Sequence, residues 1–127
     1  MNRPTESELE ILQILWNKGP STVRTINDAL NERRKVGYTT TLKIMQIMTE
    51  KELLERELIN RSHLYSPTSQ PEDIRRSVVD HLVETAFNGN TSNLVLQALG
   101  HKKVSGDEID AIKDLLNRME DDRNGNS

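Results

Sequence analysis

Residues 38–48 carry side chains whose chemistry suits contact with nucleic acid. A helix turns about 100° per residue, so four polar residues fall within one narrow sector of its surface: Thr39, Lys43, Gln46 and Glu50. Thr39 also suits the N-cap, because its hydroxyl can accept a hydrogen bond from a free backbone N–H group. Hydroxyl, ammonium and amide groups at a helix N-terminus can reach base edges and phosphates in a DNA major groove. The other interpretation is an ordinary solvated face, and the flanking elements decide between the two.

The composition limits the classes of protein that fit the chain. Its 127 residues suit one or two small domains, and a hydrophobic content of 34% favours a small core with burial shared with a second subunit. The chain has no cysteine, which excludes disulfides, thiolate metal sites and a cysteine nucleophile and suits a reducing cytosol. No apolar run approaches the ~18 residues of a membrane span, and the N-terminus is polar at once. We therefore expect no signal peptide and a cytoplasmic location.

The charge distribution favours a local nucleic-acid surface in the first half. The net charge of −3 argues against a generally basic protein that coats DNA. Residues 1–66 contain ten Lys and Arg against nine Asp and Glu, whereas residues 67–127 contain seven against eleven. We therefore expect a phosphate-binding surface in the first half, with the acidic second half facing away from DNA.

The first half predicts three helices followed by a β-hairpin. Thr5 with Glu8 three residues later forms a capping-box pattern, and Gly19-Pro20 stops the first helix. Apolar stripes give two more helices, and β-prone residues on both sides of a polar centre give the hairpin. The predicted ranges are about 6–18, 23–34 and 39–54 for the helices and 58–67 for the hairpin. This order is that of a winged helix-turn-helix, in which the third helix contacts DNA and the hairpin forms a wing.

The second half predicts a separate helical domain. Prolines and serines in residues 66–71 mark a boundary, which divides the chain into a winged-helix DNA-binding domain, 1–67, and a second domain, 68–127. Ser105 and Glu108 form a second capping-box pattern. The predicted helices cover about 71–88, 94–99 and a last stretch from 105 to a disordered acidic tail, which begins at about 120. The fold class is therefore mainly α with a small β-hairpin.

The aliphatic surface of the second domain favours a dimer. Three short helices in ~55 residues cannot bury this much apolar surface alone, and closed two-fold pairs are the commonest oligomers. The alternative is a helical subdomain folded back on its own chain. The expected interface residues are Ile74, Val78, Leu82, Phe87, Leu94, Leu99, Ile109, Ile112 and Leu116.

Several segments match one known family. They are residues 5–16, 23–26, 38–43, 64–67, 87–89, 93–96 and 105–109. Through them the chain resembles the penicillinase-repressor family, also called the BlaI/MecI/CopY family of bacterial transcriptional repressors. The resemblance implies a homodimeric winged-helix repressor whose third helix enters the major groove of a palindromic operator. It also implies that Thr41 and Lys43 lie in the part of that helix that meets DNA, whereas family members commonly have Pro-Lys in place of Thr39-Thr40.

The resemblance also suggests how repression is relieved. In the β-lactamase branch of the family, a membrane sensor triggers proteolysis in the short helix after the long dimer helix. The bond here would fall between Gln97 and Ala98, where cleaved family members have Asn-Phe. The copper-responsive branch ends in a cysteine-rich hook, and a chain without cysteine cannot use thiolate-bound copper as its signal.

The helix pattern and the resemblance together give the expected DNA contacts. Base and near-base contacts are expected from Thr39, Thr40, Thr41, Lys43 and Gln46. Phosphate contacts are expected from Arg24, Arg61 and the cluster Arg33-Arg34-Lys35, with His63 beside them in the wing. The alternatives are a solvated helix end for the cluster and plain exposure for His63.

The predicted function is a sequence-specific DNA-binding repressor that excludes polymerase from a promoter and is released when its dimer is lost. The alternatives are a winged-helix module that binds another protein without operator DNA, and a helical regulator that senses a small ligand. His63, His81 and His101 lack metal-site spacing, so we expect neither a metal nor a cofactor. No phosphate-binding, dinucleotide or nucleophile-elbow motif is present, so we expect no enzyme activity.

Overall fold

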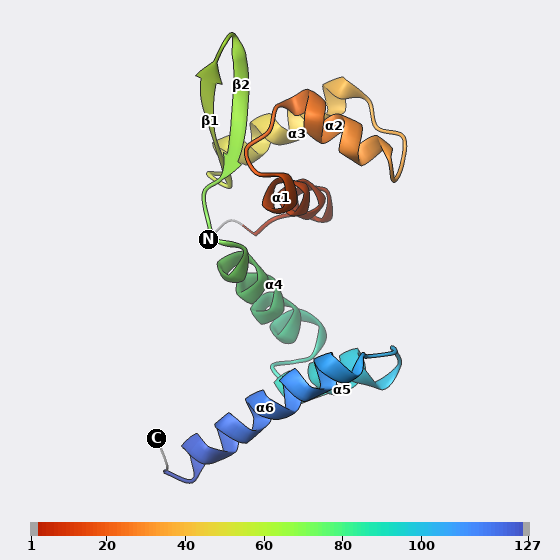
Figure 1. The fold of residues 1–127 in the computed structure, drawn as a ribbon, viewed down its shortest axis with the longest axis vertical. Coiled ribbons are helices and arrows are strands. Elements are labelled where there is room, and N and C mark those ends of the chain that lie inside the picture. The colour runs from red at the N-terminus through yellow and green to blue at the C-terminus, as the bar shows by residue number, and fades with distance from the viewer. Residues whose placement is uncertain (1–2, 126–127) are drawn as a thin grey trace. The chain divides into compact units, whose positions relative to one another are not determined.

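The computed structural model describes residues 3–125, over which the chain forms six α-helices and one two-stranded antiparallel sheet (Figure 1). The elements are α1 (Glu6–Lys18), α2 (Val23–Asn31), α3 (Tyr38–Glu50), β1 (Leu54–Ile59), β2 (Ser62–Pro67), α4 (Pro71–Ala86), α5 (Thr91–Gly100) and α6 (Gly106–Arg123). The predicted class, mainly α with a small β-hairpin, is confirmed. Among the described residues, no helix has both the length and the apolar content needed to cross a membrane.

The chain forms two compact units, residues 1–81 and 82–127. The predicted division after residue 67 coincides with the end of β2. The first unit extends further, because Ile74 is buried and Val78 is partly buried against its hydrophobic core. These two residues were expected in a dimer interface, but Ile74 has little surface left for a second subunit.

Helix α1 has the predicted bounds, and local hydrogen bonds explain both ends. The hydroxyl of Thr5 accepts from the backbone N–H of Glu8 at 3.2 Å, and the Glu8 carboxylate accepts from the backbone N–H of Thr5 at 2.8 Å. This reciprocal pair is the predicted capping box. At the other end Gly19 has φ 83°, and its N–H donates to Leu15 O at 2.7 Å. Glycine reaches this backbone conformation at little cost, so the helix stops there.

Helix α2 ends at Asn31 rather than near residue 34 as predicted. The side-chain amide of Asn31 donates to Val36 O at 2.8 Å and accepts from Val36 N at 3.2 Å. These two hydrogen bonds hold residues 32–37 in the turn before α3. They compete with the backbone hydrogen bonds that would extend α2 by another turn. The basic cluster Arg33-Arg34-Lys35 therefore lies in the turn and does not close the helix.

Helix α3 differs from the prediction at both ends. It begins at Tyr38 with Gly37 as its N-cap, so the prediction of Thr39 as N-cap was wrong. Its end is a Schellman arrangement, in which Leu53 N donates to Met48 O and Glu52 N donates to Thr49 O. Glu52 occupies the left-handed position of this motif with φ 65°. The helix thus stops at Glu50, and the hairpin starts at residue 54.

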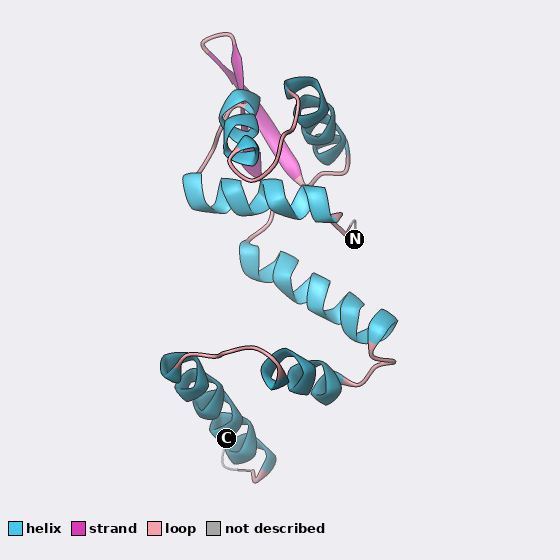
Figure 2. Cartoon of the chain, turned by 90° about the vertical axis from the view of Figure 1, so that its right-hand side faces the viewer, coloured by secondary structure: helices cyan, strands magenta, loops and turns pink. Residues whose placement is uncertain are grey.

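The hairpin is present as predicted, although it begins four residues earlier (Figure 2). Ile59 pairs with Ser62, so the turn consists of two residues, Asn60 and Arg61. Their φ values of 48° and 68° are both positive, as a type I′ turn requires. Backbone bonds between Ser21 and Tyr65, at 3.0 and 2.8 Å, attach β2 to the segment before α2.

The core of the first unit lies among the three helices and the base of the hairpin. Its fully buried side chains are Ile11, Leu12, Leu15, Ile26, Leu30, Met45, Met48, Leu54 and Tyr65. Trp16 packs at the edge, where the guanidinium carbon of Arg75 in α4 lies 5.2 Å from the centroid of its ring. An aliphatic core with one buried tyrosine fixes the position of α3 and leaves its other face to solvent.

The second unit begins within α4 and contains α5 and α6. Asn90 and Ser105 cap the two later helices, and the Ser105 hydroxyl accepts from Glu108 N at 3.1 Å as predicted. Helix α6 continues to Arg123, so the prediction of disorder from about residue 120 was wrong for 120–123, while residues 126–127 lie outside the described part. Of the described residues in this unit, Val83 is the one buried hydrophobic side chain.

Candidate nucleic-acid interface

Helix α3 has one buried and one exposed face. Met45 and Met48 are fully buried on the core side, whereas the predicted polar residues are exposed. These exposed residues are Thr39, Thr40, Lys43, Gln46 and Glu50. The predicted row of hydroxyl, ammonium and amide groups therefore faces solvent, and it begins in the first turn of the helix.

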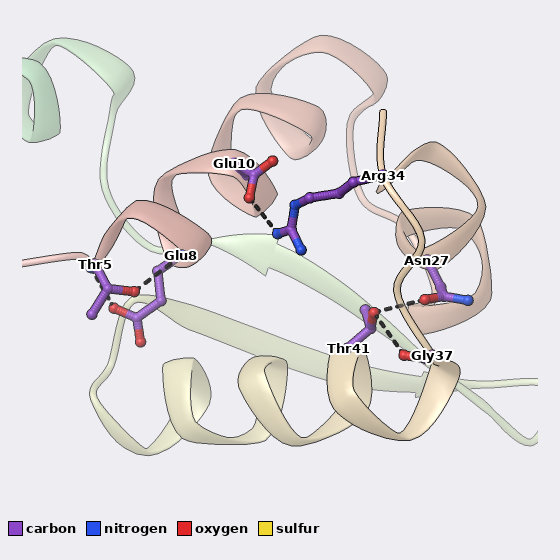
Figure 3. Close-up of polar contacts among 7 residues, drawn as sticks. All are labelled: Thr5, Glu8, Glu10, Asn27, Arg34, Gly37 and Thr41. Carbon is purple, nitrogen blue, oxygen red and sulfur yellow. Dashed lines mark hydrogen bonds and ion pairs between the residues drawn. The ribbon is translucent and has the colours of Figure 1, made fainter. Parts of the chain in front are cut away.

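Thr41 does not belong to this row. Its side chain is fully buried, and its hydroxyl lies 2.7 Å from Asn27 Oδ1 and 3.3 Å from Gly37 O (Figure 3). With its amide nitrogen toward the turn, Asn27 would donate to both Thr41 Oγ1 and Val36 O, and Thr41 would donate to Gly37 O. Thr41 thus fixes the start of α3 against α2, and the expectation that it contacts DNA directly does not fit its burial.

Three separated segments form a groove of about 380 Å³ beside the start of α3. Arg24 comes from α2, Tyr38 from α3, and Arg61 and His63 from the hairpin, with Leu42 among the apolar lining residues. The guanidinium carbon of Arg24 lies 5.4 Å from the centroid of the Tyr38 ring, within the range of a cation–π contact. Two of the predicted phosphate-contacting side chains, Arg24 and Arg61, are therefore neighbours, with His63 beside them. The sequence prediction missed Tyr38, because it began the third helix one residue later, although an aromatic residue beside a polar row was a usable signal.

The pleat of the hairpin separates its charges. Arg56 pairs with Tyr65 across the strands, so it shares the face of that buried side chain. Glu55 and Glu57 alternate with Arg56 and lie on the opposite face. Arg56 lines a small hollow with Gln46 of α3, and the sequence prediction missed it. The side of the wing next to α3 is thus cationic, and its carboxylates point away.

The basic cluster in the turn before α3 is partly neutralised. Arg34 forms an ion pair with Glu10 of α1, and this hydrogen bond and the charge of Glu10 raise the pKa of the guanidinium (Figure 3). Arg33 and Lys35 are exposed. The cluster therefore offers Arg33 and Lys35 as cations for phosphates, since Arg34, although also exposed, is paired with Glu10 and holds the turn against α1.

The described part of the chain contains no cluster of potential metal ligands. No three His, Asp or Glu side chains there are arranged to hold an ion. His63 lies in the groove, with its ring centroid 6.4 Å from that of Tyr65.

The polar row and the groove occur in a chain that matches a known family along most of its length. The family model described as Penicillinase repressor matches residues 4–118. The chain belongs to the penicillinase repressor family. This confirms the resemblance drawn from the sequence motifs.

Individual members of the penicillinase repressor family match nearly end to end. Transcriptional regulator BlaI of Mycobacterium tuberculosis is 28% identical over 122 residues, which cover 94% of this chain and 87% of the relative. A penicillinase repressor of Staphylococcus aureus is 21% identical and covers 87% of this chain and 88% of its own. The methicillin resistance regulatory protein MecI of Mammaliicoccus sciuri is 21% identical, with coverages of 90% and 93%. The relatives named here are transcriptional regulators and repressors.

Solved structures share the fold of this penicillinase repressor family member. A MarR family protein from Bacillus stearothermophilus has a TM-score of 0.55 and 16% identity, and covers 97% of this chain and 77% of its own. The PcaV transcriptional regulator from Streptomyces coelicolor has a TM-score of 0.51 and 15% identity, with coverages of 94% and 77%. At identities this low, the structural similarity establishes the fold alone. The shared fold confirms the predicted winged helix-turn-helix.

The residues that the family resemblance singled out in the second unit lie on exposed helices. Gln97 and Ala98 are exposed near the end of α5. Of the predicted interface residues in this unit, four are exposed and three are half-buried. The exposed residues are Leu82, Leu99, Ile109 and Leu116, and the half-buried ones are Phe87, Leu94 and Ile112.

Proposed function

We propose that this chain is a sequence-specific transcriptional repressor that binds a palindromic operator as a homodimer. The observation that carries the proposal is the exposed row of Thr39, Lys43 and Gln46 on α3, next to a groove lined by arginines. Membership of a repressor family supports it. Repression follows if the bound dimer excludes polymerase from a promoter.

The contacts divide into two kinds. Side chains on the exposed face of α3 enter the major groove, where Lys43 can donate to guanine and Gln46 can pair with adenine. Arg24 and Arg61 hold phosphates beside the start of this helix, and His63 lies in the same groove. The carboxylates of the wing do not oppose this arrangement, because they lie on its far face.

The unburied apolar surface of the second unit supports a dimer. Three of its side chains are more than half exposed, Leu96 at 68%, Leu116 at 53% and Met119 at 57%. A second copy can cover such a surface on both chains at once, since a two-fold interface is self-complementary. The dimer then presents two recognition helices about one DNA turn apart, roughly 34 Å. Leu82, Phe87, Leu94, Leu99, Ile109 and Ile112 remain the other proposed interface residues.

Relief of repression follows from loss of the dimer. Two coupled half-sites bind far more tightly than one, so a monomer leaves the operator. Cleavage between Gln97 and Ala98 in α5 would remove α6 and most of the exposed apolar surface. A membrane sensor with a protease, as in the β-lactamase branch, is the proposed partner.

The experiment that tests the proposal is selection of bound sequences from a random DNA pool with the purified full-length protein. We expect a palindrome with half-sites spaced by about one helical turn, and binding that weakens steeply as salt rises. Sedimentation of a Leu116→Asp variant should show a monomer with weak operator binding. Recovery of no motif, with salt-insensitive retention, would favour a protein-binding module and contradict the proposal.

A further inference from the structure

Apart from the aromatic ring of Tyr38 in the first turn, the exposed face of α3 contains one large apolar side chain, that of Ile47. Ile47 is 41% exposed and lies one turn beyond Lys43 and two turns beyond Thr40, so the three share one stripe of the helix. Its sequence neighbour Met48 is fully buried, and the nearby Ile44 packs against the core. Ile47 is therefore not a core residue that extends slightly into solvent.

A single exposed isoleucine is common on protein surfaces and by itself needs no explanation. The position of Ile47 gives it significance, because it interrupts a row whose other members all carry polar groups. An aliphatic side chain cannot hydrogen-bond a phosphate or a polar base edge. In the major groove, one base presents an apolar group, the C5-methyl of thymine.

We propose that Ile47 packs against the C5-methyl group of a thymine in each half-site and so helps to select the operator sequence. The inference rests on the proposed function, since it requires α3 to enter the major groove. The nearest polar members of the row, Lys43 and Gln46, contact the adjoining bases.

The geometry of the helix restricts which thymine is contacted. Four residues of helix rise by about 6 Å, which corresponds to about two base-pair steps. The thymine under Ile47 therefore lies within about two base pairs of the base contacted by Lys43. A thymine elsewhere in the half-site does not meet this condition.

The test replaces each thymine of the selected operator, one at a time, with deoxyuridine, which removes the methyl group alone. We expect one position per half-site where the wild-type protein loses affinity about three- to tenfold, the scale of one buried methyl group. The Ile47→Ala variant should bind thymine and deoxyuridine equally at that position. Alanine favours helix, so this variant is expected to fold, and thermal unfolding followed by circular dichroism checks it.

Ile59 provides the matched control, because it is also 41% exposed but lies in β1, outside the row. An Ile59→Ala variant should keep the difference between thymine and deoxyuridine. If the wild type shows no such difference near the Lys43 contact, or if Ile47→Ala retains it, the inference is wrong while operator binding stands. If no operator can be selected at all, the proposed function and the inference fail together.

Discussion

The ammonium of Lys51 lies 2.7 Å from the carboxylate of Glu8, and so joins the C-terminal end of α3 to the first turn of α1. The Glu8 side chain is 5% exposed and already accepts the backbone N–H of Thr5 in the capping box. Burial of a carboxylate costs free energy because its hydration is lost. The ammonium of Lys51 and the backbone N–H of Thr5 offset this cost at Glu8. The recognition helix is thus fixed at its far end by an ion pair and at its near end by the buried Thr41.

Replacing Lys51 with methionine should destabilise the first unit. The substitution keeps the aliphatic stem but leaves the Glu8 carboxylate buried without its cation, at a cost of about 1–3 kcal/mol in the free energy of unfolding. Urea denaturation followed by circular dichroism measures the change. Lys18→Met, at the exposed end of α1, is the control and should change stability by less than about 0.5 kcal/mol. Equal losses in both variants would show that the ion pair does not stabilise the fold.

Replacing Glu52 with glycine should stabilise the protein. Glu52 has φ 65° at the left-handed position that ends α3, where an L-residue costs about 1–2 kcal/mol. Glycine removes this steric cost and loses part of the gain to backbone entropy, so we expect the free energy of unfolding to rise by about 0.5–1 kcal/mol. Differential scanning calorimetry should show a higher Tm. The same substitution at Glu57, inside β1, should lower it.

Local patterns account for the parts of the fold that were predicted to the residue. The capping box at Thr5 and the side-chain cap at Ser105 each involve residues three apart, so the sequence contains all the information that sets these helix starts. The end of α2 was misplaced because it depends on the contact of Asn31 with Val36 across the turn. The end of α3 was misplaced because Glu52 occupies the left-handed position that ends the helix. A glycine at this position would have indicated the helix end in the sequence.

The sequence predicts which face of α3 is exposed, but it does not predict which side chains of other elements lie beside that face. Periodicity separates the exposed Lys43 from the buried Met45. The family resemblance put Thr41 among the DNA contacts, but its hydroxyl contacts Asn27, which lies 14 residues away in the sequence. Periodicity likewise indicates that Ile74 faces an apolar environment, but it does not distinguish a dimer interface from the core of the same chain. In the structure Ile74 packs in the core of its own chain. The groove joins Arg24 to Arg61, which only the fold brings together.

Replacing Arg61 with glycine should move stability and DNA affinity in opposite directions. Arg61 has φ 68° at the hairpin turn, so glycine relieves its backbone and should not lower the free energy of unfolding. The same change removes a proposed phosphate contact, so operator affinity should fall and its salt dependence should lose about one unit of slope. Asn60→Gly is the matched variant, because Asn60 has φ 48° but no charge, and it should keep full affinity. Unchanged binding by Arg61→Gly would exclude this contact.

Lys43 and Thr41 should differ in how their loss affects DNA binding. Lys43 is exposed on α3, so Lys43→Ala should leave stability nearly unchanged and cost about 1–3 kcal/mol of binding free energy if the ammonium contacts a guanine. The loss should be larger on the operator than on random DNA.

Thr41→Val should instead lower the free energy of unfolding by about 1–3 kcal/mol, because the buried hydroxyl of Thr41 and its hydrogen bond with the half-buried Asn27 amide are lost. Its effect on binding should follow from the altered start of α3 and should therefore be spread over several base positions. Titrations of single-base operator variants distinguish the two patterns. An equal loss on operator and random DNA for Lys43→Ala would reduce Lys43 to a phosphate contact, since a phosphate carries no sequence information.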